Sequence, residues 1–376
     1  MKQVFFDNAA TTPMLDEVIE TMVDAMRQNN GNPSSIHAEG RRARAAVEQA
    51  RKQIAKHIGA SIGEIFFTSG GTESNNMALK CAVRDLGVQR IISAATEHHC
   101  VLHSLEALTR ERGVEVVFVN LEPSGRPDLL HLEQLLQQSD RKTLVSLMHA
   151  NNEIGVMIDL DTVSSLCVTY GAYFHSDTVQ TMGFFPMDVS KTKISFLAGS
   201  AHKFHGPKGI GFIYINSDNL IQPYIDGGAQ ERNMRGGTEN LYGIIGLAKA
   251  LELAYANVET WRPHTTAVRD YLRAQLQANF PDVLINGDPD QGHYKLLSAS
   301  FPPSSRSEML LFNLDIAGIR VSGGSACSSG SNVGSHVIAA LPAHPQEYTT
   351  IRFSLSHLNT KEEVDFVVEK LKTCLI

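Results

Sequence analysis

Short β-branched or apolar runs alternate with longer amphipathic stretches up to about residue 255, and this alternation constrains the fold more than any other feature of the sequence. The strand-like runs occur in GEIFFTSG, RIISAATEH, EVVFVNL, TLVSLMHANN and GIGFIYI, and helical stretches such as ESNNMALKCAVRDLG separate them. Strands that alternate with helices form an α/β domain with a mainly parallel sheet, and its ligands bind at the carboxyl ends of the strands. We therefore expect the chemistry to lie in the loops that follow the strands.

The regular alternation of strand-like and helical segments ends near residue 255. After it, a helical segment leads into short strands, a helix, a glycine- and serine-rich loop and a closing helix. A chain of 376 residues also exceeds what one hydrophobic core usually organises. We predict a large domain over residues 15–255 and a smaller α+β domain over residues 256–376. Residues 1–14 are expected to join the smaller domain, because Pro13 and a polar run mark a boundary there.

Charge and cysteine content narrow the class of protein. The net charge is -7 and no cluster of Lys and Arg stands out, which argues against nucleic acid or an anionic membrane as the main partner. No stretch approaches the roughly 18 apolar residues of a membrane span, and the five cysteines show no CxxC pair. We expect a cytoplasmic protein that acts on a small ligand and has neither a disulfide framework nor a structural zinc site.

A lysine and a carboxylate each close a strand-like run. Lys203 ends SFLAGSAHK among small residues, where an amine can be desolvated and act in its neutral form, as Schiff-base chemistry requires. Asp177 ends AYFHSD about two dozen residues earlier and could hold a protonated pyridine nitrogen, while Gln180 could donate to a phenolate oxygen. The alternatives are a solvated loop lysine and an aspartate that caps the next helix.

The turn FFTSGGTES brings Gly71 and Thr72 to the start of a helix, where free N–H groups favour a phosphate. Ser200 and His202 could complete the same phosphate site. In TEHHC, His98 follows another strand and could stack on a flat ring and shuttle protons, although chemistry alone does not decide between His98 and its neighbour His99.

Cys327 lies in SGGSACSSGS, a polar loop in which a thiol stays accessible as a nucleophile. The other four cysteines, Cys81, Cys100, Cys167 and Cys374, are expected to serve packing. Arg352 stands in the apolar run TTIRFSLSH and needs an anionic partner, which is either a substrate carboxylate or a structural ion pair.

Taken in order, these stretches resemble the pyridoxal-phosphate-dependent cysteine desulfurases of the class V aminotransferase superfamily, of the nitrogenase and iron-sulfur-cluster type. The resemblance covers nearly the whole chain. It rests on DNAATTP, GNPSSIH, TSGGTESNN, TEH, HANNEIGV, HSDTVQ, SAHKFHGPKGIG, ERNMRGGTEN, SGGSAC and IRFSL. It implies fold type I of the pyridoxal-phosphate transferases, with the Cys327 loop and Arg352 in the small domain.

The resemblance also implies a role for each site residue. Lys203 forms the Schiff base, His98 stacks over the ring and Cys327 carries sulfur. The residues implied to hold the cofactor are Gly71, Thr72, His98, Asn152, Asp177, Gln180, Ser200, His202, Lys203 and, from the second subunit of a homodimer, Thr238. The residues implied to lie near the substrate are Asn8, Asn32, Asn152 and Arg352.

The implied reaction converts L-cysteine to L-alanine and leaves a persulfide on Cys327, whose sulfur passes to an acceptor protein of an iron-sulfur cluster or thiolation pathway. No resident metal is expected, and the only metal contact would be a passing one between Cys327 and a cluster. The alternative is another class V enzyme, such as a selenocysteine lyase or an aminotransferase. Such an enzyme would share Lys203 and Asp177 without needing Cys327.

Overall fold

The computed structural model describes residues 2–304, 306–323, 334–342 and 344–375. Its largest element is a seven-stranded sheet. In spatial order the strands are β2 (Ile65–Thr68), β8 (Gly211–Ile215), β7 (Phe196–Ser200), β6 (Tyr173–Asp177), β5 (Thr143–Ser146), β3 (Arg90–Ser93) and β4 (Glu115–Phe118). β8 runs antiparallel to both of its neighbours, β2 and β7, and the other pairs of this sheet are parallel, so the predicted α/β class with a mainly parallel sheet is confirmed.

The strands are short, and most are buried along their whole length, as expected of a parallel sheet covered by helices. The helices of this part are α1 (Asp16–Gln28), α2 (Ala38–His57), α3 (Gly71–Asp85), α4 (His99–Arg112), α5 (Leu129–Gln137) and α6 (Leu160–Thr169). Side chains at strand-to-helix junctions cap several of them: Asp128 accepts from Leu130 N at the start of α5, and Asp159 from Asp161 N at the start of α6. These caps fix where each loop ends and its helix begins.

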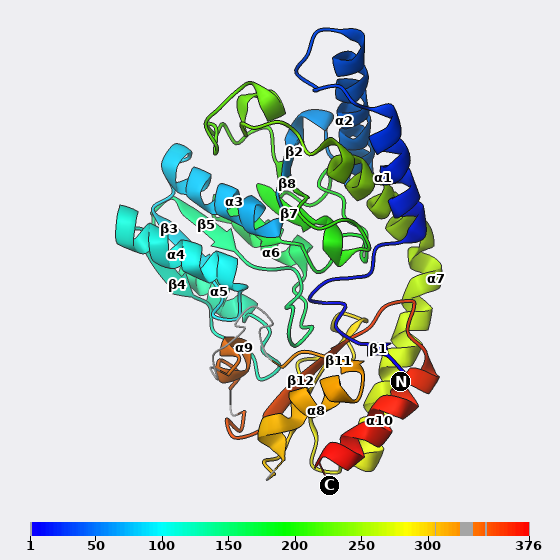
Figure 1. Cartoon of the computed structure of the whole chain (residues 1–376). Helices are drawn as coiled ribbons and strands as arrows, with labels where there is room; N and C mark the ends of the chain where they lie inside the picture. Colours follow the sequence, from blue (N-terminus) through cyan, green and yellow to red (C-terminus); the bar gives the residue numbers. More distant parts are fainter. Residues whose placement is uncertain (1, 305, 324–333, 343, 376) are drawn as a thin grey trace.

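A smaller group of strands lies below the main sheet in Figure 1. Strands β9 (Leu284–Asn286), β10 (Leu296–Phe301) and β12 (Thr349–Ser354) form an antiparallel sheet in the order β12-β10-β9. The N-terminal strand β1 (Val4–Phe5) pairs in parallel with β11 (Ile319–Arg320). The helices here are α8 (Leu310–Ile316), α9 (His336–Ala339) and α10 (Lys361–Leu375). The N-terminal strand therefore lies with the C-terminal part of the chain.

The long helix α7 (Leu241–Asn279) runs along one side of the molecule past both sheets (Figure 1). Its first half, up to Ala254, packs into the hydrophobic cluster under the large sheet, and its second half, from Val268, packs into the cluster of the small sheet. The boundary between the two hydrophobic clusters thus falls within one continuous helix, which also contains Pro263. The domain division predicted at residue 255 stays a prediction.

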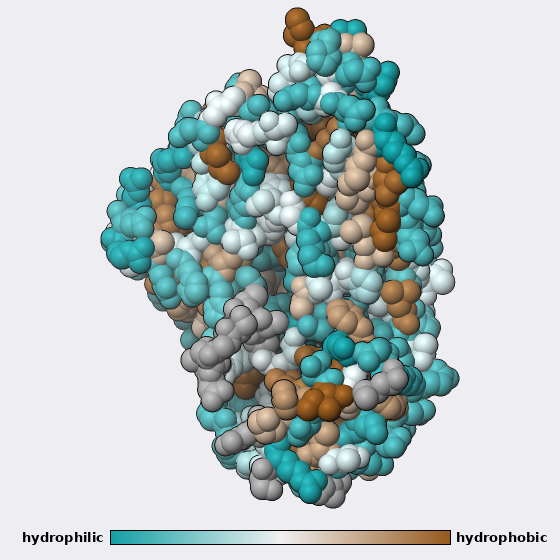
Figure 2. Space-filling model, in the orientation of Figure 1, coloured by the Kyte–Doolittle hydropathy of each residue, from teal (hydrophilic) through white to brown (hydrophobic). Residues whose placement is uncertain are grey.

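Hydrophilic residues cover most of the face shown in Figure 2, and the brown hydrophobic residues are scattered among them. The most exposed large apolar side chains of the described residues are those of Ile36 and Leu220, which lie in separate loops, and of Leu130 in α5. Scattered apolar residues of this kind are ordinary on a folded surface. None of the described helices is long and apolar enough to cross a membrane.

Candidate active site

A pocket of about 350 Å³ opens at the carboxyl ends of β2, β3, β5, β6 and β7, where the sequence places its chemistry. Ten residues singled out from the sequence line it. They are Gly71, Thr72, His98, Asn152, Asp177, Gln180, Ser200, His202, Lys203 and Arg352. All but Arg352 come from loops and strand ends of the large sheet, and Arg352 reaches the pocket from β12.

Lys203 closes a short 3-10 turn, Ala201–Lys203, that directly follows β7. Its Nζ atom donates to the backbone oxygens of Ala9 and Ala10, at 2.7 and 2.9 Å. These two carbonyls belong to the segment after β1, so the N-terminal segment positions the lysine amine in the pocket. The side chain is half-buried, unlike that of a solvated loop lysine.

Asp177 is the last residue of β6 and is buried. Its Oδ1 atom accepts from Val179 N at 2.9 Å, and its Oδ2 accepts from Asn75 Nδ2 at 2.6 Å. The segment 178–195 contains turns and no helix, so Asp177 does not cap one. Gln180 donates to Ala9 O at 3.0 Å, and its Oε1 atom is buried without a partner among the described residues. One of its two amide protons is therefore already engaged.

The glycine turn that precedes α3 meets β7 at one corner of the pocket. A Cβ atom on Gly71 would lie 2.6 Å from Val179 Cγ2, so only glycine fits there and the backbone can approach a ligand closely. Ser200 is buried beside this turn, at the end of β7. Burial, together with the charge of Lys203, lowers the pKa of His202 to about 4, so His202 is neutral near pH 7. The start of α3, Ser200 and the neutral His202 ring thus line the same pocket, and helix N–H groups and hydroxyls are donors that can bind a phosphate.

His98 is the N-cap residue of α4, and its Nδ1 atom accepts from Cys100 N at 3.2 Å. Burial lowers the pKa of His98, which favours the neutral ring. His99 also lines the pocket, where its ring packs against that of His336 from α9 at a centroid distance of 4.3 Å. The structure therefore brings both histidines to the pocket and gives the capping contact to His98.

Arg352 forms a structural ion pair and also lines the ligand pocket, so both partners that the sequence leaves open are compatible with its position. Its Nη2 atom forms an ion pair with Asp7 Oδ1 at 2.9 Å, and its Nη1 donates to Asn152 O at 2.9 Å. Its Nε atom is buried without a partner among the described residues, and the side chain lines the pocket. The arginine is thus held by a structural ion pair and still presents a guanidinium edge at the ligand site.

Three predicted residues do not line this pocket. The Asn8 side chain is buried and donates to Ser354 O at 2.9 Å, because the segment after β1 turns it towards β12. Asn32 lies in the connection between α1 and α2, where its Oδ1 accepts from Ser34 N. Thr238 is exposed in a separate hollow beside Ser69. Cys327 lies outside the described residues.

Cys100 was expected to serve packing, and it does pack against a hydrophobic cluster that includes Met77 and Val101, but packing is not its only contact. Cys100 lines the pocket, and its Sγ atom lies 3.0 Å from His98 Nδ1 and 3.3 Å from Asn75 Nδ2. Asn75 follows Thr72 by three residues, one helical turn, so helical spacing in TESNN would have placed it on the same face. No comparable signal marks Cys100, because its helix is amphipathic and could equally have turned it into the core.

Glu97 is a further residue that the sequence reasoning missed. It is buried, and burial raises the pKa of its carboxyl well above the usual range, which favours the protonated form. Its Oε1 atom accepts from Met148 N at 2.6 Å, and its backbone oxygen accepts from His336 Nε2 at 2.9 Å. Glu97 therefore ties the β3 and β5 loops together and anchors α9 beside the pocket. Among the described residues, no group of three or more His, Cys, Asp or Glu could hold a metal ion.

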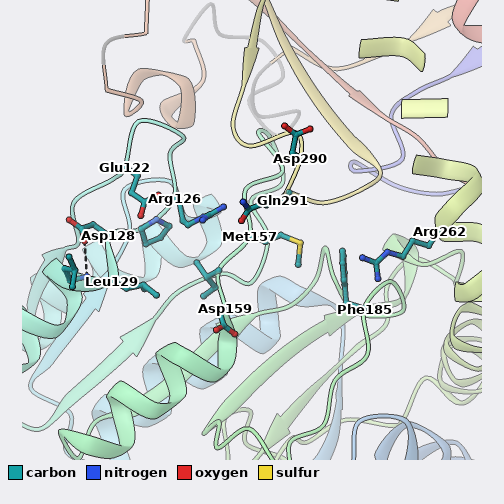
Figure 3. A pocket seen from close by; sticks show the side chains of 14 residues that line it. Glu122, Arg126, Asp128, Leu129, Met157, Asp159, Phe185, Arg262, Asp290 and Gln291 are labelled. Atoms are coloured by element: carbon teal, nitrogen blue, oxygen red, sulfur yellow. Dashed lines mark hydrogen bonds between the residues drawn. The ribbon is translucent and has the colours of Figure 1, made fainter. Parts of the chain in front are cut away.

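A second hollow, of about 580 Å³, lies near residues 122–130 and the turn at Asp290 (Figure 3). Its charges are largely paired: Arg126 donates to Asp288 Oδ2 at 2.7 Å, and the Arg262 guanidinium lies over the Phe185 ring. Among its lining residues there is no lysine, histidine, serine or cysteine. We therefore place the chemistry in the smaller pocket.

The smaller pocket fits pyridoxal phosphate. The buried carboxylate of Asp177 suits a protonated pyridine nitrogen, and the glycine turn at Gly71 suits a phosphate. Lys203 lines the same pocket, and the unpaired buried Gln180 Oε1 and Arg352 Nε atoms leave polar groups for a ligand to satisfy. The site can therefore bind an aromatic, phosphorylated aldehyde together with a substrate carboxylate.

Comparisons with known proteins point in the same direction. The profile of the aminotransferase class-V family matches residues 4–367. The sequence is 42% identical to a protein of Dictyoglomus turgidum named cysteine desulfurase IscS, over 99% of this chain and 96% of that protein. A solved structure described as a NifS-like protein superposes with a TM-score of 0.90 at 36% identity and covers 99% of both chains. Another, described as SspA in complex with cysteine, superposes with a TM-score of 0.80 at 29% identity, over 95% of this chain and all of that one.

Proposed function

The chain belongs to the aminotransferase class-V family and is a pyridoxal-phosphate-dependent cysteine desulfurase, and from this premise we propose that it transfers the sulfur of L-cysteine to Cys327. The observation that carries the proposal is the pocket that gathers Lys203, Asp177, His98 and Arg352. The pocket lies beside α9, whose first residue, His336, follows the Cys327 segment by a few positions.

The residues that would hold the cofactor are distributed over three corners of the pocket. Lys203 would hold its aldehyde carbon and Asp177 its ring nitrogen, while Thr72, Ser200 and His202 would hold its phosphate. When bound, pyridoxal phosphate supplies an electron-withdrawing ring that stabilises negative charge on the adjacent substrate carbon.

Residues of the chain carry out substrate binding and proton transfer. Arg352 binds the substrate carboxylate through the part of its guanidinium that lines the pocket, which orients the amino acid. Lys203, aimed by the Ala9 and Ala10 carbonyls, removes the proton from the substrate α-carbon. The neutral ring of His98 can accept or return a proton at the same site.

Sulfur transfer requires a nucleophile. The Cys327 thiolate forms a bond to the substrate sulfur as the carbon–sulfur bond breaks, which leaves a persulfide on the enzyme. The remaining three-carbon group takes up a proton and leaves as alanine. The persulfide sulfur then passes to an acceptor protein, in an iron-sulfur cluster or thiolation pathway, and a cluster would contact Cys327 only in passing.

The proposal includes a homodimer in which Thr238 serves the phosphate site of the partner. It is supported by the position of Thr238, which is exposed and does not line the pocket of its own chain. Mixing Lys203→Ala protein with Thr238→Ala protein tests this arrangement. Hybrid dimers would contain one site with both residues intact, so activity and cofactor affinity should rise above those of either variant alone. No recovery would contradict the shared site.

A cytoplasmic location is also part of the proposal. Its support is that the four described cysteines are free thiols, which suits a reducing compartment.

The first test is an absorbance spectrum before and after L-cysteine, with alanine and sulfide assayed under a reductant. A visible band that shifts, with alanine and sulfide appearing together, supports the proposal. Cys327→Ala should keep the band and lose sulfide release, whereas the control Cys374→Ala should retain both. Full turnover by Cys327→Ala would favour a selenocysteine lyase or an aminotransferase instead.

A further inference from the structure

Cys100 lines the candidate active site, although the reaction described above does not use it. Its side chain contacts residues with three different tasks. These are His98 over the cofactor site, Thr72 at the phosphate corner, and Asn75, which holds Asp177. A cysteine whose only task was packing would not need three polar partners.

The hydrogen bonds around Asn75 have one consistent direction. Asn75 is buried, and its Oδ1 atom lies 3.0 Å from His175 Nε2, while Ser146 Oγ lies 2.9 Å from His175 Nδ1. Burial lowers the pKa of His175 to about 3, so this ring is neutral and its Nε2 donates to Asn75. The amide nitrogen of Asn75 then points to Asp177 Oδ2 and to Cys100 Sγ. The sulfur atom of Cys100 therefore accepts from Asn75.

The thiol proton of Cys100 has an acceptor on the other side. His98 Nδ1 lies 3.0 Å from Sγ and already accepts from Cys100 N, a backbone donor that cannot reverse its role. With Nδ1 as their acceptor, the backbone N–H and the thiol both favour the tautomer that leaves Nδ1 unprotonated. Burial, followed by the charge of Asp177, raises the pKa of the Cys100 thiol to about 12, so the thiol keeps a proton to donate.

We propose that Cys100 is a positioning residue for the desulfurase reaction, whose thiol holds the His98 ring with Nδ1 as an acceptor and the ring proton on Nε2. The inference rests on the proposed function of the pocket and adds a residue to it. A fixed tautomer matters because a ring that exchanges protons with a substrate must present the same nitrogen at each turnover. Burial and the nearby charge of Asp177 keep the thiol protonated, so a second cysteine can stand in a sulfur-handling pocket without accepting sulfur.

The test compares Cys100→Ala with Cys100→Ser, with Cys374→Ala as the control for loss of a thiol outside the pocket. A serine hydroxyl can replace the S–H donor, and alanine cannot. Loss of one neutral hydrogen bond predicts a fall in kcat of about 2- to 10-fold for Cys100→Ala. Cys100→Ser should recover most of this loss, and Cys374→Ala should match the parent protein.

Solid-state NMR of ring-¹⁵N-histidine protein, with and without cofactor, reads the tautomer directly, and His98→Gln identifies the signals. We expect a non-protonated Nδ1 and a protonated Nε2 in the parent and in Cys100→Ser, and a mixture of tautomers in Cys100→Ala. Unchanged His98 signals in Cys100→Ala would overturn the inference, because the backbone N–H would then suffice. Absence of turnover in the parent would instead refute the proposed function, and the NMR comparison would still decide the role of Cys100.

Discussion

Replacing Arg352 by methionine removes two interactions of this arginine, the ion pair with Asp7 and the proposed contact with the substrate carboxylate. The Arg352 side chain is 3% exposed and that of Asp7 is 20% exposed, so the pair is largely buried. Removing one partner of a fully buried pair costs about 3–5 kcal/mol, because the other charge stays buried and unpaired. Since Asp7 retains some contact with water, we expect Arg352→Met to lower the free energy of unfolding by about 2 kcal/mol.

The effect on the substrate has a different origin. Losing a charge-assisted contact to a carboxylate costs about 1.5–3 kcal/mol, which raises KM for L-cysteine about 10- to 150-fold. Because the contact is made to a carboxylate that does not react, we expect kcat to change much less than KM.

The double variant Asp7→Asn/Arg352→Met distinguishes the two effects. It has no unpaired aspartate, so urea unfolding should show that stability returns most of the way to the parent value. KM, measured by steady-state alanine formation, should remain raised. The reasoning is refuted if KM returns to the parent value together with stability, because Arg352 would then act only through Asp7.

Three further changes probe the cofactor corner, the core and the buried histidines. Gly71→Ala should weaken cofactor binding, measured by absorbance titration of the apoprotein, because its Cβ atom meets a neighbouring side chain at 2.6 Å. Gly63→Ala should not, because a Cβ there would meet only Arg232 Nη1, at an ordinary contact distance of 3.6 Å. Glu231→Ala leaves the buried Arg51 without its bidentate partner, so urea unfolding should show a loss of about 3–5 kcal/mol, and a loss below 1 kcal/mol would contradict the pairing. Burial lowers the pKa of His149 from 6.5 to about 4, so the unfolded chain binds more protons between these values and stability should fall as the pH drops through this window. His149→Asn should flatten that decline, and an unchanged pH dependence of the unfolding midpoint would contradict the assignment.

The sequence by itself determined the fold class and the position of the site along the chain. Asp177 and Ser200 close apolar strand runs, and Gly71 opens a helix after another, so the carboxyl ends of parallel strands had to bring them to one edge of the sheet. The sequence signals for these positions are local, because the end of a strand and the start of a helix each depend on a few neighbouring residues. The motifs then narrowed the chemistry to a lysine, a carboxylate and a phosphate corner.

Only the tertiary structure decided which side chains meet across the chain. Asp7 and Arg352 are 345 positions apart, and no local pattern pairs them. The path of the segment after β1 likewise turns Asn8 away from the pocket and brings the Ala9 and Ala10 carbonyls to Lys203. The orientation of the first turn of α4 decides that Cys100 lines the pocket in addition to packing against the core. Contacts between distant segments depend on packing and hydrogen bonding in three dimensions, and the sequence carries no short-range signal for them.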